Sequence, residues 1–403
     1  NSFTHKLVWR AGGVGNNMKH ILTTTIYDLA FGAKGIGKID GKICFVEGAL
    51  PGEEVEFEVI KDTSRYMEGK VTKIITASKD RILPVCPYYV ECGGCSLQHV
   101  SYERELFYKQ EQVVQLIRRI AGCKDFLCEK IEKSDKYYNY RSSVTVHSKG
   151  SGFGYFASKS HSIIKIKECV VADKAINEIL PELEKSVEKK NVTLKVDHNA
   201  GVWSSSVLGE KFFIDRYCGM DVYLSTKAFS QANRYIAERI AEVLETWIGS
   251  DTEDAVFFDL CCGTGFFSFL LKQKFLLKVG VDSNRVAIEC AKRTLKMSDE
   301  KNIKFYKGSV ENVFWELYEK NKSRSNVLFI DPPRAGVNNT LLKKIAGLEE
   351  LNAIYYLSCD VACLARDIKV LIADGKWRLA KALPFDMFPR TGHIEVLAEI
   401  VRV

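Results

Sequence analysis

The sequence lacks an apolar run long enough to cross a membrane. Its longest candidates are interrupted by a charged residue within about ten positions, whereas a spanning helix needs roughly 20 apolar residues in succession. An excess of one charge is also missing, because 58 Lys and Arg residues face 51 Asp and Glu residues and leave a net charge of +7. We therefore expect no membrane partner, while the mild positive charge permits a nucleic-acid partner without requiring one.

A regular disulfide framework is missing as well. The 13 cysteines are odd in number and irregular in spacing, which argues against a secreted disulfide-rich domain and favours a reducing compartment in which some cysteines bind a metal or perform chemistry. Residues 1–17 lack the apolar core of a signal peptide and show no strand or helix pattern. We expect a non-native or disordered extension there, Met18 as the candidate start, and a cytoplasmic monomer.

The length of 403 residues predicts two or three domains. Residues 18–82 contain short strand-like runs separated by glycines, Gly35 and Gly37 among them, which is typical of an OB-type barrel. Residues 83–224 read as a smaller central α+β domain. Residues 225–403 alternate helices and strands, the pattern of a doubly wound α/β domain. Its expected strands cover 255–260, 277–282, 326–331 and 353–360.

A helix is predicted over residues 101–121, with Ser101 as a possible N-cap. Apolar residues recur on one of its faces, namely Leu106, Val113, Leu116 and Ile120. This helix belongs to the central segment; its packing on the C-terminal domain is expected only from the family resemblance described below.

Three cysteines, with glycines between two of them, form the strongest metal signal. They are Cys86, Cys92 and Cys95. Clustered thiols without a metal are an oxidation liability, so a thiolate-ligand loop is expected. Zinc and iron–sulfur clusters each use four ligands, and the second CxxC of a zinc ribbon is absent downstream. A cluster with one distant ligand is favoured, and the spacing leaves open Cys123, Cys128 and Cys169.

Residues 136–167 contain no Asp or Glu but six Lys or Arg residues. Six aromatic residues accompany them: Tyr137, Tyr138, Tyr140, Phe153, Tyr155 and Phe156. Positive charges meet phosphates and aromatic rings stack on unpaired bases, so the stretch predicts a surface for single-stranded RNA. The alternative is a hairpin whose aromatic residues belong to the core.

A candidate nucleophile, Cys359, stands at the end of the expected strand 353–360, between Ser358 and Asp360. The carboxyl ends of parallel strands are where ligands bind in such sheets. A lone cysteine is normally an inert core residue, but the motifs DPPRAG at 331–336 and FPRTGHIE at 388–395 follow neighbouring strand-like runs. The presence of these two motifs favours a catalytic role for Cys359.

The turn after strand 255–260 predicts a cofactor site. Gly263 and Gly265 allow close approach of the backbone to a ligand, and Asp282 ends the next strand, where it can accept hydrogen bonds from a ribose. The third glycine of the dinucleotide fingerprint is missing. A cofactor without pyrophosphate, S-adenosylmethionine, therefore fits better.

The motifs DLCCGTG, FIDPPRAG, YLSCD and FPRTGHIE, in this order and with CPYYVECGGC upstream, resemble the RNA uracil-5 methyltransferase family. The similarity runs from Met18 to the C-terminus and is closest to the iron–sulfur 23S ribosomal RNA enzymes with an N-terminal TRAM domain. It implies a Rossmann-like methyltransferase domain behind a TRAM barrel and a central iron–sulfur domain. It also implies a 4Fe–4S cluster held by Cys86, Cys92, Cys95 and Cys169.

The resemblance implies roles for the C-terminal residues too. Cys359 would add to carbon 6 of uracil so that carbon 5 can take a methyl group, and Glu395 would remove the proton from carbon 5. The residues implied to contact the cofactor are Gln231, Cys261, Asp282 and Asp331, beside the backbone of Gly263. Two positions depart from the family, which commonly has an aromatic residue at Cys261 and an asparagine at Phe266.

The substrate expected from the resemblance is 23S ribosomal RNA, with the T-loop uridine of transfer RNA as the alternative. A methyltransferase acting on an exocyclic nitrogen would need neither Cys359 nor Glu395. An RNA-binding protein that merely uses a methyltransferase scaffold also stays open, because fold alone does not establish function.

Overall fold

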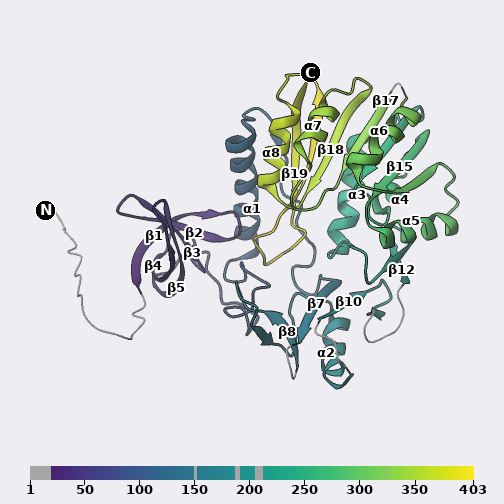
Figure 1. Cartoon of the computed structure of the whole chain (residues 1–403). Helices are drawn as coiled ribbons and strands as arrows, with labels where there is room; N and C mark the ends of the chain where they lie inside the picture. The colour runs from purple at the N-terminus through teal and green to yellow at the C-terminus, as the bar shows by residue number, and fades with distance from the viewer. Residues whose placement is uncertain (1–19, 149–151, 187–190, 205–211, 324) are drawn as a thin grey trace. The chain divides into compact units, whose positions relative to one another are not determined.

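The computed structural model describes residues 20–148, 152–186, 191–204, 212–323 and 325–403 (Figure 1). The predicted extension 1–17 lies outside this range. The chain divides into two compact units. The first unit consists of the chain up to Lys79 without Phe31–Ala33. The second unit consists of Asp80–Val403 together with Phe31–Ala33. Among the described helices, none combines the length and the apolar character of a transmembrane span.

The first unit is a closed barrel with the strand order β1-β2-β3-β5-β4. Its strands are β1 (Ile21–Ala30), β2 (Lys34–Ile39), β3 (Lys42–Glu47), β4 (Glu54–Asp62) and β5 (Tyr66–Thr76). The predicted barrel is therefore present, but the expectation that Gly35 and Gly37 lie in turns is wrong, because both lie within β2. A Cβ at Gly35 would come within 2.9 Å of Ile26, and one at Gly37 within 2.7 Å of Thr24. Glycine is needed there because the facing side chains pack against the backbone.

The second unit begins with an α+β region. Helix α1 (Tyr102–Leu116) continues into a π-helical turn, η1 (Ile117–Ala121). An antiparallel sheet follows, in the order β11-β10-β7-β8-β9. Its strands are β7 (Ser143–Ser148), β8 (Phe153–Phe156), β9 (Ile163–Lys165), β10 (Asn191–Val196) and β11 (Val202–Trp203), with helix α2 (Lys174–Ser186) beside them. A two-stranded ribbon leads onward, β12 (Phe212–Tyr217) and β13 (Met220–Ser225).

The C-terminal part contains an eight-stranded sheet in the order β16-β15-β14-β17-β18-β20-β19-β6. Its strands are β6 (Leu127–Cys128), β14 (Ala255–Leu260), β15 (Leu277–Asp282), β16 (Ile303–Lys307), β17 (Ser325–Ile330), β18 (Leu351–Ser358), β19 (Trp377–Phe385) and β20 (Glu395–Arg402). Strands β14 to β18 are parallel, and β20 runs antiparallel to both of its neighbours. The four predicted strands are thus present.

Helices cover both faces of this sheet. The helices are α3 (Arg234–Ile248), α4 (Phe266–Leu270), α5 (Arg285–Met297), α6 (Val310–Asn321), α7 (Asn339–Ala346) and α8 (Val361–Leu371). Alternate residues of β14 point to two different cores: Val256 and Phe258 pack with α6, α7 and α8, whereas Phe257 packs with α3 and α4. This two-sided burial explains why five of the six residues of β14 are apolar, Asp259 being the exception. The doubly wound α/β prediction is confirmed.

Helix α1 with η1 packs beside α8 (Figure 1), but the predicted buried face is wrong in part. Leu106 and Ile120 are half-buried, and Glu105 and Lys109 are fully buried instead. Ser101 occupies the N-cap position, although its side chain makes no capping hydrogen bond.

Candidate functional site

The turn after β14 is held by the neighbouring strands. The Cys262 amide donates to the Val281 carbonyl at 3.0 Å, and the Gly263 amide donates to the Asp282 carboxylate at 2.9 Å. Cys261 and Gly263 both have positive φ, 63° and 54°, a conformation that brings backbone amides toward one point and costs least for glycine. The second Asp282 oxygen accepts from the Asn284 amide at 2.7 Å. The Asp282 carboxylate is therefore fixed at the end of β15.

A cavity of about 630 Å³ opens at this turn, at the carboxyl ends of β14, β15, β17 and β18. All of the predicted cofactor and catalytic residues line it: Gln231, Cys261, Gly263, Asp282, Asp331, Cys359 and Glu395. They come from six separate segments of the sequence, so the fold brings the predicted site together. The size suits a small-molecule cofactor.

Strand register places Cys359 close to Glu395. Strand β18 pairs antiparallel with β20, and Ser358 lies opposite Val396. Cys359 follows Ser358, and Glu395 precedes Val396, so both emerge at the same edge of the sheet. Glu395 is 6% exposed, whereas Cys359 is half-buried. The arrangement puts a thiol and a carboxyl group at the mouth of the same cavity.

Burial and neighbouring charges keep this thiol protonated at rest. Desolvation, with the Glu395 carboxyl beside it, raises the pKa of Cys359 to about 11, and the positive charge of Arg334 opposes this shift. Desolvation raises the pKa of Asp331 to about 8 and that of Glu395 well above its usual range. Cys359 also directly precedes Asp360, which caps α8 by accepting from the Cys363 amide at 2.9 Å. A helix N-terminus favours a thiolate.

The segment that carries Gln231 is held by the central region. The Ser142 amide donates to the Ala232 carbonyl at 2.8 Å. The buried Lys195 ammonium donates to the Ser225 carbonyl at 3.0 Å and to the Ala228 carbonyl. Lys195 and Ser142 were not identified from the sequence as residues that support the site. Their contacts are with the segment around Gln231, which is distant from both in the sequence.

Phe229 was missed too, although a signal for it exists. Its side chain is 68% exposed and lines the cavity two residues before Gln231. Phe266 is buried edge-to-face against Tyr217 with 4.9 Å between ring centroids. Phe229 is an aromatic residue next to a predicted cofactor residue in an RNA-related sequence, and it could have been singled out from the sequence for that reason.

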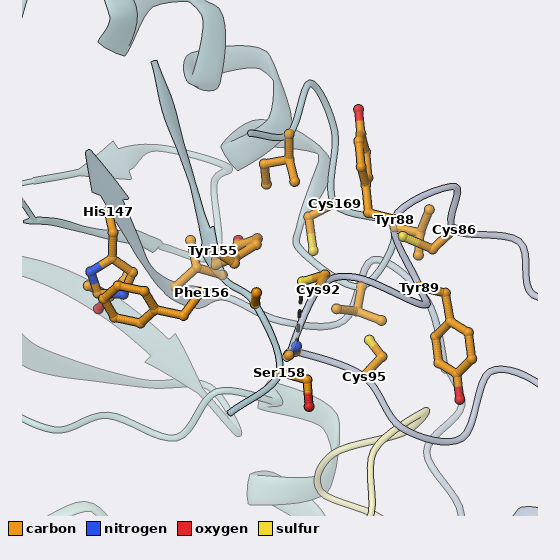
Figure 2. Close-up of a pocket in the computed structure, with 18 of the residues that line it drawn as sticks. Cys86, Tyr88, Tyr89, Cys92, Cys95, His147, Tyr155, Phe156, Ser158 and Cys169 are labelled. Atoms are coloured by element: carbon orange, nitrogen blue, oxygen red, sulfur yellow. Dashed lines mark hydrogen bonds between the residues drawn. The ribbon is translucent and has the colours of Figure 1, made fainter. Parts of the chain in front are cut away.

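A second cavity, of about 900 Å³, is lined by all four predicted cluster ligands: Cys86, Cys92, Cys95 and Cys169. Figure 2 shows these cysteines, three from one loop and Cys169 from another segment, around a common space. The Gly94 amide donates to the Cys92 sulfur at 3.4 Å. Of the alternatives for the fourth ligand, Cys123 and Cys128 pack against the core of the eight-stranded sheet instead.

The cluster itself is not shown. Across the described residues, no three or more His, Cys, Asp or Glu side chains are already arranged as metal ligands. Burial raises the pKa of Cys95 to about 12 and also raises those of Cys86 and Cys92. The donor set nevertheless fits, because four thiols within reach of one cavity are the ligands that a 4Fe–4S cluster uses.

The aromatic residues of 136–167 divide between core and surface. Tyr140 and Phe153 are buried, 2% and 5% exposed, so the expectation of a wholly RNA-facing set is wrong for them. Tyr137 and Phe156 are 39% and 36% exposed. The Phe156 ring stacks on His147 at 3.9 Å between centroids (Figure 2), and its carbonyl accepts from the Gly93 amide at 2.9 Å. Phe156 therefore adjoins the cysteine loop, whereas the Tyr137 ring stacks on Tyr102 with 4.6 Å between centroids.

Known proteins resemble the chain along nearly its whole length. The sequence profile of the tRNA (Uracil-5-)-methyltransferase family matches residues 219–401, and that of the TRAM domain matches residues 21–72. An uncharacterized RNA methyltransferase of Clostridium tetani is 31% identical, with 93% of this chain and 95% of the relative aligned. A 23S rRNA (uracil(1939)-C(5))-methyltransferase of Vibrio parahaemolyticus is 28% identical over 90% of this chain and 92% of its own.

Among solved structures, the Pyrococcus abyssi tRNA (uracil-54, C5)-methyltransferase in complex with S-adenosyl-L-homocysteine has a similar fold. The TM-score is 0.73 at 23% identity, covering 94% of this chain and 100% of that chain. Fold and cavity together define the class of S-adenosylmethionine-dependent methyltransferases. Within this class, the chain belongs to the RNA (uracil-5-)-methyltransferase family and carries an N-terminal TRAM domain.

Proposed function

We propose that this enzyme methylates carbon 5 of a uridine in 23S ribosomal RNA through a transient covalent bond between Cys359 and carbon 6. The observation that carries the proposal is the register of β18 and β20, which brings Cys359 and Glu395 together beside the cofactor cavity. The 23S substrate is favoured by the relatives at 27–28% identity in Vibrio and Aliivibrio, which are named for that activity.

Each chemical step uses a group at the cavity. The Cys359 thiolate adds to carbon 6, and the electron pair of the ring double bond moves into an enolate whose carbon 5 is nucleophilic. Bound S-adenosylmethionine supplies the methyl group from its sulfonium. The Glu395 carboxylate then takes the proton from carbon 5. The double bond re-forms as the carbon–sulfur bond breaks, and the Cys359 thiolate is regenerated.

The cofactor residues have distinct parts in this proposal. The Asp282 carboxylate, held by two backbone amides, keeps lone pairs for ribose hydroxyl groups. Gln231, Cys261 and Asp331 contribute lining from three sides, and the Gly263 turn admits the cofactor close to the backbone. Arg334 favours the thiolate of Cys359 by its charge.

We also infer a 4Fe–4S cluster bound by Cys86, Cys92, Cys95 and Cys169. The shared cavity of the four thiols supports it, as does the resemblance of CPYYVECGGC to the iron–sulfur members of the family. Its part would be structural or RNA-positioning, because methyl transfer from a sulfonium needs no electrons.

RNA contact is proposed for Phe156 beside this loop and for the exposed ring of Tyr137, since unpaired bases stack on aromatic side chains. The target uridine must leave its stack to reach Cys359. An RNA substrate places the enzyme in the cytoplasm, and we propose that it acts there as a monomer.

The substrate is tested with labelled S-adenosylmethionine and unmodified transcripts of 23S rRNA and of transfer RNA, followed by mapping of 5-methyluridine. The proposal expects label in 23S rRNA at a single type of site, uridine carbon 5. Label confined to the T-loop of transfer RNA would overturn the substrate assignment while leaving the chemistry intact. Label in neither RNA would contradict the proposed substrates altogether.

A further inference from the structure

The loop between β19 and β20 leads directly to Glu395, and the central region holds it from outside. The Ser96 and Leu97 amides both donate to the Arg390 carbonyl at 3.0 Å. The Tyr140 hydroxyl donates to the Pro389 carbonyl at 3.0 Å. This loop therefore owes its shape to residues about 250–300 positions earlier in the sequence.

Buried charges make the strongest of these connections. Lys109 on α1 is fully buried, as are Glu105 and Asp386. The Lys109 ammonium lies 2.8 Å from the Glu105 carboxylate and 2.6 Å from the Asp386 carboxylate. It also donates to the carbonyl of Phe388 at 3.3 Å, and Phe388 lines the cofactor cavity together with Glu395.

Arg390 is fixed in an unusual conformation by the same network. Its φ is 68°, in the left-handed region that costs energy for a residue with a side chain. Its backbone amide donates to Glu105 at 2.7 Å, and its guanidinium donates to the Val100 carbonyl at 3.0 Å. A strained residue persists where its surroundings over-determine it. Here Glu105 provides two of the constraints, because its second carboxylate oxygen also accepts from the Arg390 guanidinium at 3.4 Å.

Buried ions are costly to desolvate, so stability alone is a poor reason to keep them. Burial by itself would lower the pKa of Lys109, but the charges of Asp386 and Glu105 outweigh it and raise the pKa. The lysine therefore remains an ammonium with a defined set of acceptors. Such a group fixes the geometry of its partners more sharply than an apolar side chain could.

We propose that Lys109, with Glu105 and Asp386, positions the loop that presents Glu395 to the substrate. Lys109 is thus a positioning residue for proton removal. The inference rests on the proposed role of Glu395 as base. Cys359 lies in the turn between β18 and α8, whereas the network holds the loop before β20. The addition of its sulfur to carbon 6 therefore depends less on the network.

The step affected is the last one. There the Glu395 carboxylate accepts the proton of carbon 5, the electron pair of that bond re-forms the ring double bond, and the bond from carbon 6 to the Cys359 sulfur breaks. If the loop shifts, addition and methylation proceed while release slows. The methylated RNA then stays attached to the protein.

The test compares Lys109→Met with wild type and with Arg104→Met. Arg104 lies on the same helix but pairs with Asp80 at 2.9 Å, outside the loop. For Lys109→Met we expect turnover to fall at least about tenfold, single-turnover methylation to stay within about threefold of wild type, and covalent protein–RNA complex to accumulate on denaturing gels. Arg104→Met should behave as wild type.

The inference is overturned if Lys109→Met slows the addition of Cys359 to carbon 6 as much as it slows release of the methylated RNA. Turnover equal to that of wild type overturns it as well. Because Lys109→Met leaves carboxylates buried without their partner, the double variant Lys109→Met/Asp386→Leu is measured beside it. It should fold with a melting temperature nearer to wild type yet keep the slow release. Full recovery of turnover in the double variant would contradict positioning. A wild-type protein that forms no covalent complex with 5-fluorouridine RNA would instead refute the proposed mechanism.

Discussion

The reactivity of Cys359 depends on how much thiolate its surroundings allow. Its pKa of about 11 exceeds neutral pH, raised by burial and by Glu395. Since thiolate is the reactive form, its fraction grows about tenfold per unit of pH below the pKa. We expect the rate of covalent addition to RNA to rise from pH 6 to pH 9, measured by rapid quench. A plateau already reached below pH 7 would contradict this picture.

Arg334 is the charged group that opposes the upward shift of the Cys359 pKa. Removing it in Arg334→Met should lower the thiolate fraction and slow covalent addition about tenfold at every pH from 6 to 9, because this range lies below the pKa of Cys359. The affinity for RNA should stay unchanged. The pH–rate profile of the variant should lie at higher pH than that of wild type. Arg366→Met, which removes an arginine paired with Asp367, is the matched control. An equal loss of RNA affinity in the variant would instead indicate a contact between Arg334 and RNA.

Asp282 should contribute to cofactor affinity as an acceptor for ribose hydroxyls. The substitution Asp282→Asn keeps the shape but removes the charge, and hydrogen bonds to charged groups are worth about 1.5–3 kcal/mol. We expect the Kd for S-adenosylmethionine to rise by about 10- to 100-fold in calorimetry. The melting temperature without cofactor should fall somewhat, because the new NH2 group faces one of the two backbone amides from which Asp282 accepts. An unchanged Kd would remove Asp282 from the site.

At this scale, the sequence predicted residues that end a strand or stand in a motif. Cys359 and Asp282 were found because each stands where an expected strand ends. Glu395 was assigned only from the resemblance of FPRTGHIE to the family. Lys109 could not be found in this way, because its partner Asp386 is 277 positions away. A lysine in an amphipathic helix pattern reads as solvated.

Among the secondary-structure elements, α8 shows how local capping supports the site. Asp360 caps this helix through the Cys363 amide and directly follows Cys359. The substitution Asp360→Ala should lower the free energy of unfolding by about 1 kcal/mol, measured by urea denaturation. Asp360→Asn keeps a capping acceptor and should lose less. Equal losses in both variants would assign the effect to charge rather than to capping.

Two other elements mark the limits of pattern reading. Strand β2 was missed because Gly35 and Gly37 resemble turn residues, and the reason for them is close packing against Ile26 and Thr24. Helix α1 was found, but its buried face was assigned from apolar periodicity. The buried charges of that face contact the loop between β19 and β20. This loop is distant in the sequence, so the periodicity of the helix gives no sign of it.

On the scale of the whole molecule, two cavities carry the predicted chemistry, and the loop 386–391 connects them. Ser96 and Leu97, which bond to Arg390, directly follow Cys95. A cluster bound by the cysteine loop would therefore stabilise the segment that holds the Glu395 loop. The sequence indicated both centres, but their connection depends on the packed fold.

Anaerobically prepared protein should show the broad brown absorbance of an iron–sulfur cluster. Cys92→Ser should lose this absorbance, because the serine oxygen is a poor ligand for the cluster. Cys218→Ser changes an exposed cysteine elsewhere and should keep the colour. Colourless wild-type protein with stoichiometric zinc would refute the cluster assignment.

The central claim is that the sulfur of Cys359 bonds to the uracil ring during methylation. It is tested most directly with RNA containing 5-fluorouridine and S-adenosylmethionine, because the fluorine at carbon 5 cannot be removed by a base and the adduct persists. We predict a protein–RNA complex that survives denaturation and is absent in Cys359→Ala. Mass spectrometry should locate the bond to RNA at Cys359. No complex with the wild-type enzyme, or an equal amount with Cys359→Ala, would contradict the account.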